Sequence, residues 1–278
     1  MTGHGSFRPV DLEGFDFTVI GGVGTLVLDR PEKRNSLSRA MWRQLPEIIA
    51  GVDADDSIGA LVITGAGGHF SAGSDIADLN VPLADFWELN STAEAAVANA
   101  RTVTIAAIEG SCVGGGTEIA AACDIRIAAE GSIFGVTAAK LGLVYPPGPT
   151  DRLAAVLGKS WARYLLVTAS IVPFEQMERL GFFHQVSSAP REAAQELGER
   201  IVGLSRLSQT GAKAVLNGEL RETGLAQAEL PGEPREERFS PPEWLDAAYR
   251  SEITRGQDAF FAKRAPEFGF HATDWRNR

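Results

Sequence analysis

The sequence predicts an α/β fold with many short strands, followed by a mostly helical C-terminal region. Through the first half of the chain, short apolar runs alternate with helical patterns in the order strand, strand, helix, without a sequence repeat. The apolar run at 59–64 lacks polar alternation, which indicates a strand covered on both faces. From about residue 151 onward the patterns are helical.

The first two strands are expected at 15–20 and 23–29, because Gly21-Gly22 between them is a hairpin signal. A helix follows, with Ser36 or Ser38 as its N-cap, and runs to about residue 52. Its apolar residues recur at helical spacing. They are Met41, Leu45, Ile48 and Ile49.

Two glycine-rich loops each follow a predicted strand. The strand at 59–64 leads into the loop 65–75, and a helix at 85–101 precedes the next strand at 102–109. The loop 110–116 comes directly after that strand. A short helix and a further strand are then expected at 115–122 and 124–128.

The C-terminal region is expected to contain helices joined by one long exposed loop. The helices are expected at 160–168, 173–180, 190–206, 209–222, 244–254 and 257–264. The loop is the polar, proline-rich segment 226–243. Aromatic residues near the end are expected to pack on other parts of the protein or on a neighbouring subunit. They are Phe260, Phe261, Phe268, Phe270 and Trp275.

Composition excludes several classes of protein. With a net charge of -10, the chain does not fit a general nucleic-acid binder, which relies on basic surface. Cys112 and Cys123 lie among small apolar residues, so we expect buried free thiols and neither a disulfide nor a metal site. No secretion signal and no apolar run of about 20 residues is recognisable, so a cytoplasmic protein without membrane spans is expected.

The glycine loops favour backbone binding of an oxygen anion over nucleotide binding. Gly110 and Gly115 have the spacing of a phosphate loop, but Gly116-Thr117 stand where its lysine would follow. Simple turns are the alternative interpretation. Because both loops lie between a buried strand and a helix start, their unpaired N–H groups would point at a common space. Donors of this kind stabilise an oxyanion.

Six segments resemble, in the same order, motifs of the enoyl-CoA hydratase/isomerase (crotonase) superfamily. They are 28–38 (LDRPEKRNSLS), 65–79 (GAGGHFSAGSDIADL), 114–126 (GGGTE and CDIR), 134–153, 158–180 and 259–264 (AFFAKR). The resemblance covers roughly residues 15 to 268. It implies a crotonase-like spiral of strand-strand-helix (ββα) units with a C-terminal helical oligomerisation region. The expected divisions are a tail at 1–14, the spiral core at 15–205 and the helical region at 206–278.

The resemblance also implies the ligand, the assembly and the site. The substrate would be an acyl-CoA, with no separate cofactor and no metal, and the assembly a homotrimer or a hexamer. The N–H groups of Ser74 and Gly115 would form the oxyanion hole. Lys263 would reach a CoA phosphate or be an ordinary solvated lysine. The other residues expected beside CoA are Lys33, Arg34, Ala72, Ser74, Asp75 and Ile76.

Enoyl-CoA hydratases use two glutamates, and this sequence keeps only one of the two positions. Glu118 matches the first, three residues beyond Gly115 and so on the same helix face. At the second position the chain has Ala138, which carries no proton. Losing such a group costs roughly 10²–10⁴-fold in rate. Enolate chemistry is therefore expected to survive, and hydration to be weak.

Tyr145, Asp75 and two histidines are further candidates for a chemical role. Tyr145 matches a tyrosine of methylmalonyl-CoA decarboxylases, although these have a histidine where this chain has Ser74; it could instead be a wall residue bonded to backbone. Asp75 is expected to cap a helix rather than to move protons. His69 and His184 have no partner that is visible in the sequence, and both are expected to be loop or surface residues.

Three functions therefore remain open from the sequence. The first is a hydratase/isomerase-type enzyme with Glu118 as acid/base. The second is a decarboxylase of a malonyl-type CoA, in which Tyr145 shapes the pocket. The third is a protein that binds acyl-CoA without turnover.

Overall fold

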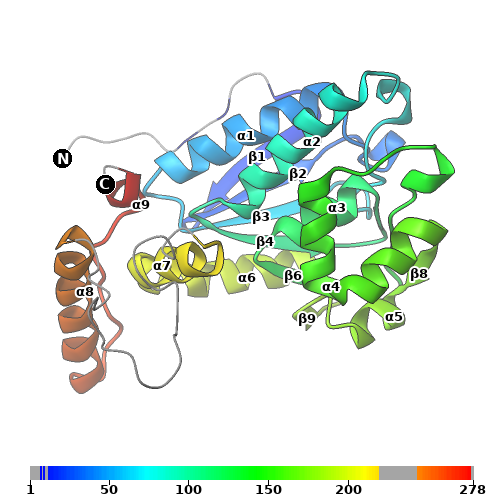
Figure 1. The fold of residues 1–278 in the computed structure, drawn as a ribbon. Coiled ribbons are helices and arrows are strands. Elements are labelled where there is room, and N and C mark those ends of the chain that lie inside the picture. Colours follow the sequence, from blue (N-terminus) through cyan, green and yellow to red (C-terminus); the bar gives the residue numbers. More distant parts are fainter. Residues whose placement is uncertain (1–6, 8, 10–11, 219–242, 277–278) are drawn as a thin grey trace, which may run out of the picture. The chain divides into compact units, whose positions relative to one another are not determined.

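Residues described by the computed structural model are 7, 9, 12–218 and 243–276. The chain falls into two compact units, Met1–Ile201 and Val202–Arg278. The first unit holds both sheets and most of the helices (Figure 1). The predicted α/β class, with helices toward the C-terminus, is confirmed.

The main sheet has six strands in the order β1-β2-β3-β4-β6-β9. They are β1 (Phe15–Ile20), β2 (Val23–Leu28), β3 (Ala60–Gly65), β4 (Val103–Ile108), β6 (Ile125–Ala128) and β9 (Gln185–Val186). β1 and β2 form the predicted antiparallel hairpin, and every later pair is parallel. The parallel arrangement follows because the chain crosses back over the sheet between these strands, mostly as helices.

A second sheet of three short strands lies in the order β5-β7-β8. They are β5 (Ser111–Val113), β7 (Ile133–Gly135) and β8 (Ile171–Pro173). The expectation of a continuous loop at 110–116 was therefore wrong, because β5 lies inside it. Strands of three residues are too short to show a period of two, so their pairing is visible only in the fold.

The helices of the first unit place the glycine loops. They are α1 (Arg39–Ala54), α2 (Leu83–Ala98), α3 (Gly115–Ala122), α4 (Pro147–Thr168), α5 (Phe174–Arg179) and α6 (Pro190–Val202). Ser38 caps α1, and its side chain accepts a hydrogen bond from Met41 N at 3.2 Å. α1 and α2 pack side by side, while α2, α3 and α4 all contact one another (Figure 1).

α4 starts earlier than the periodicity predicted. The expected helix at 160–168 is only the second half of a longer element that begins at Pro147. Proline at the first helical position costs no hydrogen bond, so the proline-rich start is compatible with a helix. Gly158 has φ 78° and kinks the element, which explains why the two halves differ in pattern.

The second unit contains three described helices, α7 (Arg206–Leu216), α8 (Glu243–Phe261) and α9 (Ala272–Arg276). Two helices were expected at 244–254 and 257–264, but α8 is continuous, because a single glycine, Gly256, does not end a helix. Trp275 packs against Trp244 and Phe270, as expected for the aromatic end. The predicted loop 226–243 lies outside the described residues except for Glu243.

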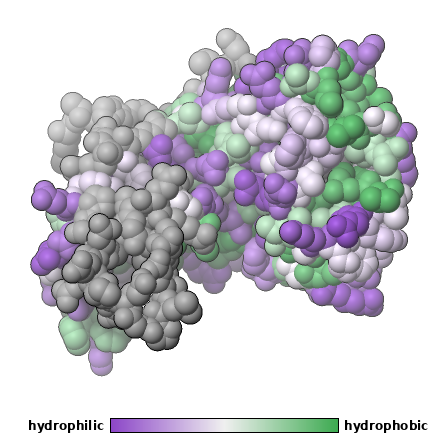
Figure 2. All heavy atoms as spheres, in the orientation of Figure 1, coloured by the Kyte–Doolittle hydropathy of each residue, from purple (hydrophilic) through white to green (hydrophobic). Residues whose placement is uncertain are grey.

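Apolar side chains also reach the surface of the first unit. Figure 2 shows them on the side that carries α4. The exposed large apolar residues of that region include Leu141, Val144, Val167 and Ile171. Among the described helices, none is long and apolar enough to cross a membrane.

Candidate active site

Asn35 fastens the first glycine loop to the segment after β2. It is fully buried and has a left-handed backbone (φ 55°), which asparagine adopts more readily than most residues. Its Nδ2 donates to the carbonyl oxygens of Ala66 (2.8 Å) and His69 (2.6 Å), and its Oδ1 accepts from Arg30 N at 3.1 Å. One side chain therefore fixes three backbone groups.

Ser71 joins the first loop to the second. Its hydroxyl donates to Asn35 O at 2.8 Å and accepts from Gly73 N at 3.1 Å. Its backbone N donates to Ser111 O at 2.8 Å, and its carbonyl accepts from Val113 N at 2.9 Å. The 65–75 loop is thus held against β5, which leads directly into α3.

This arrangement brings the backbone N–H groups of Ser74 and Gly115 together. A Cβ added at Gly73 would lie 2.9 Å from Gly115 N, and one added at Gly115 would lie 3.4 Å from Ser74 N. On either side of Ser74, Leu37 N donates to Gly73 O and Asp75 N to Leu37 O, both at 2.8 Å. Among the described residues no group accepts a hydrogen bond from either amide. The two can therefore bind one oxygen.

Trp42 of α1 supports this pair of amides, a role that the sequence analysis missed. Its indole Nε1 donates to Ser74 Oγ at 3.2 Å, and the ring lies so close that a Cβ at Gly115 would be 2.6 Å from its Cζ2. Only 2% of Trp42 is exposed. In the sequence Trp42 lies on the apolar face of the predicted helix, where it cannot be distinguished from an ordinary core residue.

Glu118 of α3 makes a hydrogen bond with Tyr145, which lies just before α4. The Tyr145 hydroxyl donates to Glu118 Oε2 at 3.0 Å, so Tyr145 is bonded to a carboxyl group and not to backbone. Glu118 is 5% exposed, and its Oε1 is buried with no partner among the described residues. Burial raises the pKa of Glu118 well above its ordinary 4.5, against the opposing effect of the Tyr145 bond.

A second buried carboxyl group, Glu94 of α2, lies in the same region. It forms an ion pair with Arg152 of α4, and 2% of its side chain is exposed. Burial raises the pKa of Glu94, while Arg152 acts in the opposite direction. The charge of Glu94 adds to the rise in the pKa of Glu118. The sequence analysis did not predict that Glu94 and Arg152 pair in this region, because in the sequence each looks like an ordinary charged residue of a helix.

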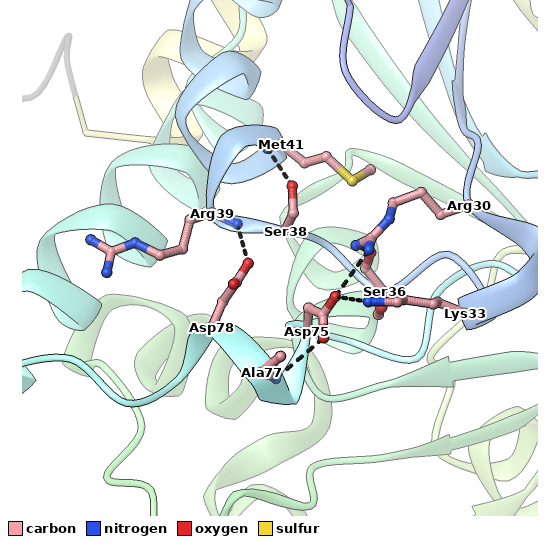
Figure 3. A network of polar contacts seen from close by, with 9 residues as sticks. All are labelled: Arg30, Lys33, Ser36, Ser38, Arg39, Met41, Asp75, Ala77 and Asp78. Carbon is pink, nitrogen blue, oxygen red and sulfur yellow. Dashed lines mark hydrogen bonds and ion pairs between the residues drawn. The ribbon is translucent and has the colours of Figure 1, made fainter.

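Asp75 forms the centre of a polar network at the end of the first loop (Figure 3). Its Oδ2 accepts from Lys33 Nζ at 2.7 Å and from Arg30 at 3.0 Å, and its Oδ1 accepts from Ala77 N at 3.2 Å. Lys33 is the main cause of the lowered pKa of Asp75. The carboxylate therefore caps the short helix η2 (Ile76–Asp78), as predicted, and is poorly suited to proton transfer.

The residues predicted to border CoA in the first unit gather around this network. Arg34 O accepts from Ala72 N at 2.9 Å, which brings two of them together. The Lys33 side chain is 47% exposed and Ile76 is 66% exposed, so both face outward.

Comparisons with known proteins agree with this geometry. A family model described as enoyl-CoA hydratase/isomerase matches residues 19–270. A Rhizobium meliloti (strain 1021) protein named "Probable enoyl-CoA hydratase" is 33% identical over 89% of this chain and 95% of its own. The 1,2-epoxyphenylacetyl-CoA isomerase of Escherichia coli (strain K12) is 32% identical, with the same coverage of both chains.

A solved structure shows the same fold. A Hyphomonas neptunium protein described under enoyl-CoA hydratase/isomerase superposes with a TM-score of 0.81 and 30% identity, covering 93% of this chain and 98% of that one. The chain belongs to the enoyl-CoA hydratase/isomerase family. The expected crotonase-like fold is thereby confirmed.

Ala138, expected where a second glutamate would stand, remains a prediction as far as its chemical role is concerned. Ala138 is 7% exposed and begins the short helix η3 (Ala138–Lys140). Its carbonyl accepts from Leu143 N at 3.0 Å, in the turn that leads to Tyr145. The described hydrogen-bond partner of Glu118 is therefore the Tyr145 phenol.

His69 lies in the first loop and His184 is exposed, as expected, but each ring has a hydrogen-bond partner that the sequence did not reveal. His69 Nδ1 accepts from Ser111 N, and His184 Nδ1 accepts from Arg126 N, both at 3.1 Å. Each ring therefore accepts a hydrogen bond from a backbone N–H group of a strand, β5 for His69 and β6 for His184. Burial lowers the pKa of His184, with Arg126 adding to the effect.

Lys263 follows α8 in the second unit. Its side chain is exposed and its backbone is left-handed (φ 52°). Its contact with a CoA phosphate remains a prediction.

Proposed function

We propose that this family member forms an enolate from an acyl-CoA thioester and moves a proton with Glu118. The carbonyl oxygen would accept hydrogen bonds from Ser74 N and Gly115 N, which favour the negative oxygen of the enolate over the neutral thioester. The observation that carries the proposal is Glu118: a buried carboxyl group, one oxygen on Tyr145 and the other without a partner among the described residues.

A single acid/base group suits isomerisation better than hydration. Glu118 would take a proton from the carbon next to the carbonyl of a β,γ-unsaturated acyl-CoA, which leaves a dienolate. The same carboxyl group would return the proton to the γ-carbon, giving the α,β-unsaturated thioester. A raised pKa makes the Glu118 carboxylate a stronger base toward that proton, and the carboxyl group so formed carries the proton to the γ-carbon. The relatives with isomerase and hydratase names support this reaction class.

The first test needs no knowledge of the true acyl group. A saturated acyl-CoA such as butyryl-CoA is incubated with the protein in deuterium oxide, and deuterium next to the carbonyl is followed by mass spectrometry. Exchange is expected for the wild type, and Glu118→Gln should slow it by roughly 10²–10⁴-fold. The exposed Glu88→Gln on α2 is the matched control. Bound acyl-CoA without exchange would indicate the non-catalytic alternative.

Substrate turnover then separates the remaining reactions. Crotonyl-CoA tests hydration, a β,γ-enoyl-CoA tests isomerisation, and methylmalonyl-CoA tests the decarboxylase alternative, which the placement of Tyr145 on Glu118 favours. We expect isomerisation to be fastest. Fast hydration would instead show that another group replaces the glutamate absent at Ala138.

Binding and assembly belong to the same proposal. The CoA moiety would lie along Lys33, Arg34, Ala72, Asp75 and Ile76, with Lys263 on a phosphate, and no separate cofactor would be needed. The assembly would be a trimer or hexamer and the location the cytoplasm.

A further inference from the structure

The segment that carries Tyr145 has little support of its own. Residues 141–146, between η3 and α4, form neither helix nor strand. Leu141 and Val144 on it are 48% and 56% exposed. Tyr145 therefore needs contacts from other elements to keep its hydroxyl on Glu118.

Those contacts come from α2, on both sides of Tyr145 in the chain. The Trp87 indole Nε1 donates to Val144 O at 2.8 Å, one residue before Tyr145. Glu94 forms its ion pair with Arg152, seven residues after Tyr145. Trp87 and Glu94 are separated by about two helical turns, so they lie on the same side of α2.

We propose that Trp87 and Glu94 are positioning residues that hold the 144–152 segment against α2 and thereby keep the Tyr145 hydroxyl on Glu118. The inference rests on the proposed function in one respect, that Glu118 is the acid/base. Neither residue needs to touch substrate. Their positioning effect passes through Tyr145, so it should depend on the Tyr145 hydroxyl, whereas the charge of Glu94 also acts directly on Glu118.

The electrostatic surroundings of Glu118 and Tyr145 also depend on the position of Tyr145. Glu118 of α3 is hydrogen-bonded to the Tyr145 hydroxyl, and the charge of Glu94 raises the pKa of Glu118. Burial is the first cause that raises the pKa of Tyr145, and Glu118 and Glu94 add to it. If Tyr145 were displaced, water would reach its hydroxyl and its pKa would be raised less.

A double-mutant cycle tests the proposal on the full chain. Trp87→Phe keeps a ring and removes the N–H donor, so deuterium exchange should slow about fivefold with unchanged affinity for the acyl-CoA. In a Tyr145→Phe background the same change should have no further effect on the rate. Equal losses in both backgrounds would overturn the proposal, because they would show that Trp87 acts independently of Tyr145.

Glu94→Gln provides the second arm of the cycle. It should also slow exchange in the wild-type background and much less in the Tyr145→Phe background. Trp161→Phe, a partly buried tryptophan on α4, and the exposed Glu88→Gln on α2 are the matched controls. Should Glu94→Gln fail to fold, Trp87→Phe still decides, since it removes one N–H group.

A spectroscopic measurement separates failure of this inference from failure of the proposed function. Alkaline titration followed by tyrosinate absorbance reports the three tyrosines, and Tyr145→Phe identifies the signal of Tyr145. Trp87→Phe should let Tyr145 ionise at lower pH than in the wild type. If the wild type shows no exchange, the proposed function fails and this titration alone decides. An unchanged titration would then overturn the inference.

Discussion

Glu118 has two carboxyl oxygens in different surroundings. Oε2 accepts from Tyr145, whereas Oε1 is buried without a partner among the described residues. Leaving a buried polar atom unpaired costs about 1–3 kcal/mol of folding free energy. The proposed substrate proton transfer at this oxygen would account for such an unpaired atom.

The raised pKa of Glu118 makes stability depend on pH. Above its ordinary pKa of 4.5 the unfolded chain loses the proton while the folded protein keeps it. Stability contributed by the protonated form is therefore lost as pH rises from 4.5 through the folded pKa. Relative to wild type, Glu118→Gln should grow more stable over that window in urea unfolding. Parallel stability curves for the two proteins would contradict the burial argument.

Gly115 has room only for hydrogen at its Cα. An added Cβ would lie 2.6 Å from the Trp42 ring, so Gly115→Ala must displace either Trp42 or the Ser74 and Gly115 amides of the proposed oxyanion hole. We expect deuterium exchange to fall by roughly 10²–10³-fold, as for loss of one donor. Gly211→Ala on α7, where nothing lies within 4 Å of an added Cβ, is the control and should keep full exchange.

At the scale of elements, the site depends on loops that side chains fasten together. Asn35 holds the 65–75 loop, Ser71 joins that loop to β5, and β5 leads into α3. α2 contacts the segment around Tyr145 through the Trp87 hydrogen bond and the Glu94 ion pair. The geometry of the candidate site is therefore a property of contacts between elements.

Replacing Asn35 should weaken the whole first unit. Asn35→Gly keeps the left-handed backbone accessible but removes the amide that bonds Ala66 O, His69 O and Arg30 N. We expect a loss of about 2–3 kcal/mol in the free energy of unfolding, since buried partners lose their bonds. Asn35→Ala should lose more, because alanine disfavours positive φ. An exposed change, Asn80→Ala, should be close to neutral in the same urea titration.

At the scale of the whole molecule, each unit exposes apolar side chains. Phe260 and Phe261 on α8 are 79% and 78% exposed, and Val167 on α4 is 72% exposed. Exposed apolar residues of this size are often covered by a partner. They support the proposal of a trimer or hexamer.

Light scattering at micromolar concentration tests the assembly. We expect the mass of a trimer or a hexamer for the wild type, and smaller species for the double change Phe260→Ser and Phe261→Ser. A wild-type monomer would contradict the proposal. A variant that keeps the wild-type mass would show that other surfaces hold the assembly.

Local patterns in the sequence were sufficient for most elements of the first half. Gly21-Gly22 predicted the hairpin, and Ser38, one of two serines considered, is the N-cap of α1. The two glycine loops predicted where the Ser74 and Gly115 amides lie near each other. These features depend on neighbours within a few residues, so they are visible without the fold. The short strand β5 and the start of α4 were missed, because pairing and packing with distant segments determine them.

The sequence by itself determined the family, the α/β class and which residues carry the candidate chemistry. Only the tertiary structure decided that Tyr145 bonds to Glu118 and that Trp42 packs beside the amides of Ser74 and Gly115. It also decided that Glu94 is buried and forms an ion pair with Arg152. The two residues in each of these contacts lie 27, 32 or 58 positions apart in the chain. No local pattern encodes such pairs, because their distance is set by how the helices pack.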